Sequence, residues 1–348
     1  MFRLREALPS DVASILDVAG HLDSVNLPHD EAAIKALVAG SVAAFSGEQE
    51  TFKREYLFVL EDVARGRVVG TSMIHAQHGT RRSPHVYFDI THEEHYSETL
   101  DRHFEHRLLR IGYNYNGPTE IGGLVLQPEL RTSPERLGKQ LSYVRFLFIG
   151  AHREWFRSEV ISELMPPLEE DGTSLLWEAL GRRFTGLSYQ EADRISSTNK
   201  EFIRTLFPQD PIYTCLLPAP VQAIIGVVGE DTRGVEHMLR KIGFSFANRI
   251  DPFDGGPHFI AKTDDITLVH QTRHATVFEL GERRAAGGLE HMGLVAVERT
   301  EAPRFIAVQG RFFLEGNHVG LEPSLSAALG VTPGDRVIVL PFEEAARA

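Results

Sequence analysis

The stretch LVLQPELRTSPERLGKQLSYVRFLFIG (residues 124–150) decides the fold of this chain. An apolar run of strand type at residues 121–126 ends before Pro128, and a polar loop with several basic residues follows. A long amphipathic helix is predicted to begin between Glu135 and Gly138. The first turn of a helix has unpaired N–H groups and the positive end of the helix dipole, so this order of elements can bind an anion. An ordinary strand–loop–helix crossover with a solvated basic loop explains the stretch as well.

The composition of the 348-residue chain limits its class. A total of 36 Lys and Arg against 48 Asp and Glu gives a formal net charge of −12, which disfavours a binder of nucleic acid or anionic membranes. Cys215 is the one cysteine in the sequence, so an intrachain disulfide and a thiolate metal cluster are excluded. The sequence has no apolar run of about 18 residues and no apolar core of a signal peptide, which predicts a cytoplasmic protein.

Local patterns predict the elements before the central stretch. Residues 2–20 are expected to form a strand, a turn and a helix, and Asp30 is expected to cap a second helix. Residues 56–76 predict an antiparallel hairpin, whereas the His- and Tyr-rich residues 77–120 are interpreted as a long connection with strand fragments. A hairpin that leads into a central strand and a crossover helix predicts a mixed-sheet α/β layer.

The second half of the chain predicts a change of class. Residues 159–165 are expected to form a strand, and residues 231–242 an amphipathic helix that ends at Gly243. From about residue 265 the pattern is all-β. Residues 325–340 there are typical of small barrels, in which a short helix leads to a Pro-Gly-Asp turn and a strand.

Several segments resemble one enzyme family. FRLREALPSDVASI (residues 2–15) is similar to the opening strand and helix of Gcn5-related N-acyltransferases, and so is the order hairpin, central strand, L-x-P-x-x-R loop and helix. Within that superfamily the chain more closely resembles arginine N-succinyltransferases, above all in FPQDPIY (residues 207–213) and RIDPFDGGPHF (residues 249–259). The resemblance implies transfer of a succinyl or related acyl group from acyl-coenzyme A to the α-amine of arginine, or of a similar cationic amino acid, in arginine catabolism.

The resemblance also implies an α+β fold in three consecutive segments. These are a Gcn5-related, acyl-CoA-binding domain with a mixed sheet and helices at residues 1–190, a second α/β half with the acceptor-side motif DPFDGGP at residues 191–264, and a β-rich, barrel-like segment at residues 265–348. The implied co-substrate is a coenzyme A thioester, succinyl-CoA, without a metal. The implied partners are the two small-molecule substrates and a homo- or hetero-oligomer, because paired unequal subunits are known in the family.

Acyl transfer from a thioester sets the donor-side requirements. The donor pyrophosphate is expected to bind basic side chains and the amides of the helix start, and the thioester carbonyl is expected to lie against a strand N–H that stabilises the oxyanion. The residues expected to bind the donor are Leu124, Val125, Leu126, Arg131, Arg136, Gly138 and Lys139.

The cationic acceptor is expected to bind carboxylates. Asp251 and Asp254 accompany a Gly-Gly turn that allows close backbone approach, and Glu163 follows a predicted strand. The alternatives are simple turn capping by the two aspartates and a solvated charge at the end of the strand.

One position departs from the family pattern. Arginine succinyltransferases resemble one another in a G-x-V-H segment whose histidine is taken as the proton donor, and here that position is Gly229. The expected catalytic residues are therefore Glu230, Asp231 and His237, and an exposed helix histidine is the alternative for the last. The missing histidine leaves open a second class of function, a catalytically silent paralogue that serves as a partner subunit or ligand-sensing module. A third alternative is an enzyme of the same fold with another acyl donor and Glu230 as base.

The chain is rich in histidine, with 16 residues. His75, His78, His85, His92 and His95 fall in the region interpreted as a connection, and two H-x-x-H pairs there suit a metal. A metal site is the less favoured interpretation, because no carboxylate or cysteine partner has diagnostic spacing and no H-E-x-x-H sequence occurs.

Overall fold

The structure is a computed structural model that describes residues 1–21, 27–81, 83–196, 199–278 and 289–342. Its contacts divide the chain into two compact units. Unit 1 comprises Met1–Ala76, Ile121–Ser158 and Thr263–Ala348, and unit 2 comprises Gln77–Glu120 and Glu159–Lys262. The units are interleaved along the chain, so the contacts divide it differently from the three consecutive segments expected from the sequence.

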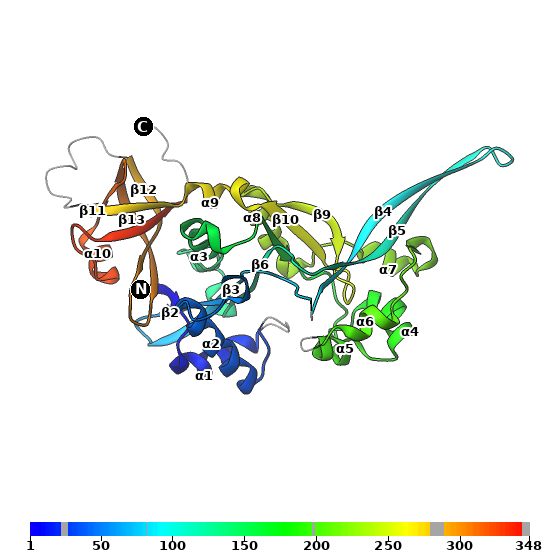
Figure 1. Ribbon diagram of the computed structural model, residues 1–348, viewed down its shortest axis with the longest axis horizontal. Coiled ribbons are helices and arrows are strands. Elements are labelled where there is room, and N and C mark those ends of the chain that lie inside the picture. Colours follow the sequence, from blue (N-terminus) through cyan, green and yellow to red (C-terminus); the bar gives the residue numbers. More distant parts are fainter. Residues whose placement is uncertain (22–26, 82, 197–198, 279–288, 343–348) are drawn as a thin grey trace. The chain divides into compact units, whose positions relative to one another are not determined.

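Unit 1 contains the elements predicted at both ends of the chain (Figure 1). Its elements are β1 (Phe2–Glu6), α1 (Val12–Ala19), α2 (Glu31–Phe45), β2 (Glu55–Asp62), β3 (Arg67–His75), α3 (Leu137–Ala151), α9 (Thr267–Gln271), β11 (Arg273–Phe278), β12 (Leu289–Glu298), β13 (Phe305–Glu315), β14 (His318–Leu321), α10 (Pro323–Leu329) and β15 (Arg336–Pro341). Strand β6 (Thr119–Leu126) begins in unit 2 and continues into unit 1. The Asp30 side chain caps α2 as predicted, because it accepts the N–H of Ala33 at 2.8 Å.

Strand β2 of unit 1 lies between β1 and β3 and is apolar on both faces. It pairs antiparallel with β1 and with β3, which confirms the predicted hairpin. Leu57 and Val59 pack in one cluster with apolar residues of α1 and α2. On the other face, the Phe58 ring lies 5.4 Å from Phe148 of α3 and 5.5 Å from Phe305 of β13. Burial on both faces explains a continuous apolar run in place of alternation.

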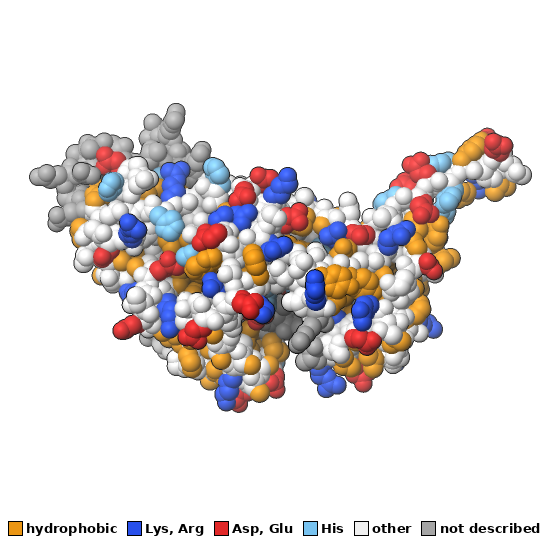
Figure 2. All heavy atoms as spheres, viewed as in Figure 1, with side chains coloured by type: hydrophobic (Ala, Val, Ile, Leu, Met, Phe, Trp, Pro, Cys, Tyr) orange, Lys and Arg blue, Asp and Glu red, His pale blue; other side chains and the backbone are white. Residues whose placement is uncertain are grey.

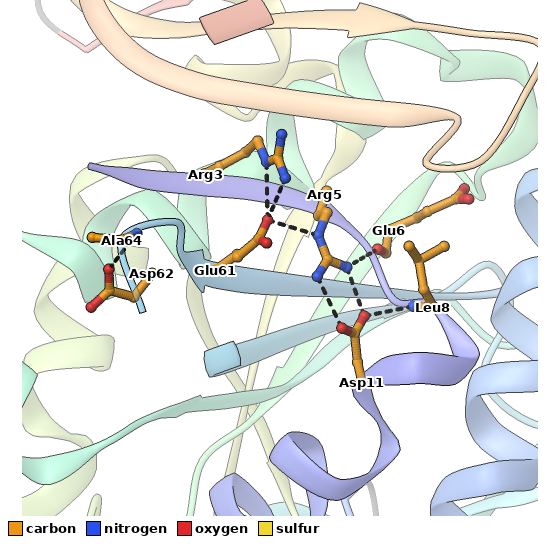
Figure 3. Close-up of polar contacts among 8 residues, drawn as sticks. All are labelled: Arg3, Arg5, Glu6, Leu8, Asp11, Glu61, Asp62 and Ala64. Carbon is orange, nitrogen blue, oxygen red and sulfur yellow. Dashed lines mark hydrogen bonds and ion pairs between the residues drawn. The ribbon is translucent and has the colours of Figure 1, made fainter. Parts of the chain in front are cut away.

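A buried charge network joins β1 to its neighbours (Figure 3). The Arg5 guanidinium donates two hydrogen bonds to Asp11, at 2.6 and 2.9 Å, and one to Glu61 of β2 at 3.0 Å. Arg3 donates to the same Glu61 oxygen at 2.7 Å. Each charge in this part of the network therefore has an opposite partner, which a buried ion requires.

The C-terminal strands belong to the same unit as the N-terminal one. Strand β13 pairs antiparallel with β1, with Leu4 opposite Ala307. As predicted, this part of the chain is rich in strands, and α10 leads through Pro333-Gly334-Asp335 to β15.

Unit 2 has strands and helices of its own. Its strands are β4 (His85–Ser97), β5 (Arg102–Asn114), β7 (Glu159–Glu163), β8 (Ile212–Tyr213), β9 (Ser245–Ile250) and β10 (Pro257–Lys262), in the order β7-β10-β9-β4-β5-β8. Its helices are α4 (Arg182–Thr185), α5 (Tyr189–Ser196), α6 (Glu201–Leu206), α7 (Ala219–Ile224) and α8 (Arg233–Lys241), and a π-helical turn spans Trp177–Gly181.

The interpretation of residues 77–120 as a long connection is wrong. Strands β4 and β5 each have 13 residues and form a continuous antiparallel ladder from His85–Asn114 to Ser97–Arg102. Only the first part of the hairpin carries apolar residues into the core of unit 2, and its outer part carries His, Glu and Asp side chains (Figure 2). A strand pair that is solvated on both faces lacks the apolar alternation by which sequence analysis finds strands.

Candidate active site

The DPFDGGP motif forms a tight turn at residues 251–256, here named the acidic turn. Asp251 accepts the N–H of Phe253 at 2.6 Å, and Asp254 accepts the N–H of Gly256 at 2.7 Å. Gly255 has a φ of +84°, and a Cβ on Gly256 would collide with the carbonyl oxygen of Leu164. Both glycines are therefore required for the chain to place two carboxylates this close to β7.

A buried tryptophan holds the acidic turn in place. The ring of Trp177 stacks on Phe253 with centroids 5.0 Å apart. The hydroxyl of Ser174 donates to the carbonyl of Phe253 at 2.8 Å and accepts the N–H of Trp177 at 3.0 Å. The aromatic residue of the motif thus anchors the turn.

Strand pairing brings Glu163 to the acidic turn. Glu163 ends β7 and lies opposite His258 of β10, while Pro257 lies opposite Ile250, the residue before Asp251. Side-chain atoms of Glu163, Asp251 and His258 lie within 4.8 Å of one another. Two of the three expected acceptor-binding residues, Glu163 and Asp251, are therefore neighbours, and the third belongs to the same turn.

Three histidines surround Glu163, and these four residues are named the Glu163 cluster. The Nε2 atoms of His85, His258 and His78 lie 3.0, 3.5 and 4.0 Å from one oxygen, Oε1 of Glu163. His85 is 2% exposed and His258 is 0% exposed. The other ring nitrogen of His78, Nδ1, lies 2.5 Å from Oε2 of Glu120 at the start of β6.

Burial shifts the protonation of these groups. Burial, and then the neighbouring Glu163, raise the pKa of Asp251 to about 7. Burial together with the charge of Asp251 raises the pKa of Asp254 well above its ordinary value. Burial lowers the pKa of His85 to about 3 and also lowers the pKa of His258, so both rings are neutral near pH 7.

Among the described residues, no side-chain contact joins the three expected catalytic residues to the Glu163 cluster. Glu230 lies in a short 3-10 turn, has an 85% exposed side chain and is 3.4 Å from Arg233. Asp231 in the same turn and His237 on α8 are also exposed. The turn is anchored near the end of β7, because the hydroxyl of Thr232 donates to the carbonyl of Met165 at 3.0 Å.

Gly229, where the resemblance led us to expect the family histidine, has no room for a side chain. Its N–H donates to the carbonyl of Met165 at 2.8 Å. A Cβ there would lie 2.7 Å from the carbonyl oxygen of Pro166 and 3.0 Å from that of Met165. The backbone of residues 165–166 thus fills the space that a histidine at this position would need.

The expected donor-binding residues lie on one strand–loop–helix of unit 1. Leu124, Val125 and Leu126 end β6, and Gly138 and Lys139 are in the first turn of α3. Arg131 and Arg136 are exposed in the loop between them. The guanidinium of Arg131 donates to the carbonyl of Leu126 at 3.2 Å, and Arg136 adopts a left-handed φ of +53° as the residue before α3. A Cβ on Gly138 would meet nothing within 4 Å, so the helix start is open to a ligand.

Sequence analysis missed Arg145 of α3. This side chain is 2% exposed and donates to neutral acceptors, the carbonyl and hydroxyl oxygens of Ser142 and the carbonyl of Gly122. Burial lowers its pKa to about 9, and no ion pair of Arg145 occurs within the part of the chain that the structure describes. A single arginine within an apolar helix pattern gives no signal of its own. His85 and His258 were missed as partners of Glu163 for a different reason, since they are distant in sequence.

Comparisons with known proteins agree on one family. The family described as "Arginine N-succinyltransferase beta subunit" matches residues 2–268. Arginine N-succinyltransferase of Yersinia enterocolitica is 33% identical over 343 residues, which cover 98% of this chain and 97% of that protein. Arginine N-succinyltransferase subunit beta of Pseudomonas aeruginosa is 34% identical over 274 residues, 78% of this chain and 79% of the relative.

A solved structure has the same fold. The arginine/ornithine succinyltransferase subunit AI from Pseudomonas aeruginosa matches with a TM-score of 0.83 and 29% identity, over 99% of each chain. Its fold, with mixed helices and strands, is thus the fold of this chain. None of the helices in the described parts of the chain is long and apolar enough to span a membrane.

Proposed function

The chain belongs to the arginine N-succinyltransferase family and is an acyltransferase, and from this premise we propose that it transfers a succinyl group from succinyl-coenzyme A to the α-amine of arginine or a related cationic amino acid. The name of the solved Pseudomonas relative includes ornithine, which is an amine of the same class. The proposed donor is a coenzyme A thioester, which fits a family that transfers acyl groups.

The acceptor assignment rests on one observation, which is that Glu163 lies beside the acidic turn. Asp251 and Asp254 are held by backbone N–H groups, and Glu163 is held by the pairing of β7 with β10. A guanidinium or ammonium group prefers several carboxylate oxygens at once, because charge-assisted hydrogen bonds are about twice as strong as neutral ones. We therefore assign these three carboxylates to the cationic end of the acceptor.

The donor is assigned to the strand–loop–helix of unit 1. The pyrophosphate binds at the start of α3, where Arg131, Arg136 and Lys139 add positive charge to the amides of the first turn. The thioester carbonyl lies against the backbone of residues 124–126, whose N–H groups stabilise the oxyanion.

A base must remove a proton from the attacking amine. We keep Glu230 for this role, with Asp231 and His237 as the other candidates, because the Met165 contacts tie its turn to the chain two residues beyond Glu163. The exposed carboxylate of Glu230 is accessible to a diffusing amine. Gly229 itself moves no proton, so the family histidine has no direct counterpart.

The assembly and location follow as further parts of the proposal. The Pseudomonas relatives are named as subunits, and we propose that this chain likewise forms a homo- or hetero-oligomer. We also propose a cytoplasmic location, as expected of a catabolic transferase whose donor is a cellular thioester.

A thiol-release assay tests the proposal. Purified protein is given succinyl-CoA with arginine, ornithine or lysine, and free coenzyme A is measured for wild type, Asp251→Asn and Glu230→Gln. Loss of a charged hydrogen bond of about 1.5–3 kcal/mol predicts a KM for arginine about 10- to 150-fold higher in Asp251→Asn, with an unchanged KM for succinyl-CoA. Glu230→Gln is expected to lower kcat.

Glu236→Gln is the matched control, because Glu236 is a carboxylate of the same region that pairs with Arg240 on α8. Its kinetics are expected to equal those of wild type. If wild type binds succinyl-CoA but releases no coenzyme A with any of the three amines, the transferase proposal fails and the silent partner subunit is favoured. If Glu236→Gln raised the KM for arginine as much as Asp251→Asn does, the assignment of the acceptor-binding carboxylates would be wrong. The transferase proposal would still stand.

A further inference from the structure

We propose that the Glu163 cluster binds one divalent transition-metal ion of the zinc class, with Nε2 of His78, Nε2 of His85 and Oε1 of Glu163 as ligands. This inference goes beyond the proposed acyl transfer and does not depend on it. With an ion on Oε1 of Glu163, the cationic end of the acceptor is left to Asp251, Asp254 and the second oxygen of Glu163. It also departs from the expectation, drawn from the sequence, of an enzyme without a metal.

The spacing of the ligand atoms fits a small tetrahedral ion. Nitrogen and oxygen ligands about 2.0–2.1 Å from zinc lie about 3.4 Å from one another. Oε1 of Glu163 lies 3.0 Å from His85, 3.5 Å from His258 and 4.0 Å from His78, measured to Nε2 in each case. The ligand atoms of His78, His85 and Glu163 all lie within 4.8 Å of one another. The observed separations bracket the ideal value, so small side-chain adjustments complete the sphere.

The atoms that face the centre of the cluster lack other partners. Nε2 of each of the three histidines and Oε1 of Glu163 are buried, and none has a hydrogen bond among the described residues. His85 and Glu163 are 3.0 Å apart without the alignment of a hydrogen bond. Buried polar atoms without partners are costly, and a bound cation would satisfy these atoms together.

The surroundings of His78 resemble the support of a metal ligand. Its Nδ1 lies 2.5 Å from Oε2 of Glu120, which accepts the Nδ1 proton and leaves the lone pair of Nε2 directed at Glu163. The ring of His85 is held between His78, at a centroid distance of 4.4 Å, and Tyr87, at 5.3 Å. Both ligand rings are thus fixed before an ion binds.

The donor set selects the class of ion. Two imidazoles and one carboxylate suit zinc and its tetrahedral analogue cobalt, whereas magnesium and calcium prefer oxygen ligands. His258, 3.5 Å from the same Glu163 oxygen, or a water completes the fourth position. A second group of candidate ligand atoms, in Glu163, Asp251 and His258, shares Glu163 with the first group.

Metal binding by the full chain, with any affinity tag removed, tests the inference. The protein is treated with a chelator and dialysed, then titrated with Zn²⁺ by calorimetry and with Co²⁺ by visible absorption. Wild type is expected to bind one ion per chain, to show a tetrahedral cobalt spectrum and to unfold at a higher temperature with Zn²⁺. His85→Ala and Glu163→Gln are expected to bind at least 100-fold more weakly and to lose the cobalt spectrum.

Two further variants keep the test decisive. His78→Gln changes a partly exposed ligand, so it is expected to fold and still to weaken binding strongly. The double variant His92→Ala/His95→Ala removes an exposed H-x-x-H pair on the β4–β5 hairpin, where His92 pairs with Glu105, and is expected to bind one ion as wild type does. Absence of binding by wild type, or loss of the ion in the hairpin variant with retention in His78→Gln and His85→Ala, would overturn the inference. Neither result depends on whether the chain releases coenzyme A.

Discussion

Replacing Gly229 with alanine tests whether the backbone of residues 165–166 leaves no room for a side chain at this position. The added Cβ would lie 2.7 Å from the Pro166 carbonyl oxygen and 3.0 Å from the Met165 carbonyl oxygen, both backbone atoms. Such overpacking costs about 1–3 kcal/mol, and displacing the Gly229 N–H from Met165 costs about 1 kcal/mol more. The φ of −65° suits alanine, so the restricted unfolded chain returns about 0.4–1 kcal/mol. The net expectation is a loss of about 1–3.6 kcal/mol of unfolding free energy.

Gly234→Ala is the matched control for this prediction. Gly234 lies on α8, five residues further on, and a Cβ there meets nothing within 4 Å. Alanine in a helix is favoured over glycine by about 0.8–1.0 kcal/mol, so this variant is expected to gain stability. Gly229→Ala is therefore expected to lower the free energy of unfolding and Gly234→Ala to raise it, although both variants replace a glycine with an alanine.

Urea unfolding provides the measurement. Each unit contains one of the two tryptophans, Trp155 in unit 1 and Trp177 in unit 2. In a Trp155→Phe background, fluorescence reports Trp177 and hence unit 2, to which Gly229 belongs. A Gly229→Ala variant as stable as its parent would refute the packing argument. The same argument predicts that Gly229→His does not restore a working histidine, because the backbone of residues 165–166 must first move.

Three further outcomes are expected. Arg136→Gly removes a left-handed non-glycine residue, so we expect about 1 kcal/mol more stability in urea unfolding but a higher KM for succinyl-CoA; an unchanged KM would contradict the donor assignment. Asp30→Ala is expected to lose about 1 kcal/mol from the same unfolding measurement, and no loss would mean that the cap of α2 is immaterial. Burial alone raises the pKa of Glu61, but Arg3 and Arg5 outweigh it and hold the pKa below the ordinary 4.5. Its stabilisation is therefore full above pH 4.5 and lost as the pH falls through the lower folded pKa, so the urea midpoints of wild type and Glu61→Gln should converge in acid and a constant difference would contradict this.

Local signals were sufficient for much of unit 1. The cap at Asp30, the hairpin at residues 56–76 and the strand–loop–helix at residues 121–150 each depend on residues close in sequence, and each was predicted. The β4–β5 hairpin was missed because its outer half is exposed and mostly polar or charged, without a regular alternation of apolar residues. Its pairing is set by the partner strand, which no local pattern reports.

The site required long-range information. Asp251, Asp254 and Glu163 were proposed from the DPFDGGP turn and a strand end, and the structure brings Glu163 and Asp251 together. The histidines of the Glu163 cluster come from a loop, from β4 and from β10. They are distant in sequence, and the pairing of β7 with β10, of β10 with β9 and of β9 with β4 places these strands in one sheet. Glu230 was chosen because it adjoins Gly229 in sequence, whereas contacts in space favour neighbours across strands.

The interleaving of the two units has a consequence for synthesis on the ribosome. Every residue of unit 2 has been made once Lys262 is added, but β1 of unit 1 meets its partner β13 only after Phe305–Glu315 has emerged. Until then one edge of the first strand is unpaired, and exposed strand edges promote aggregation. Contacts between opposite chain ends also form slowly. We therefore expect nascent chains that stall before residue 305 to need chaperone protection.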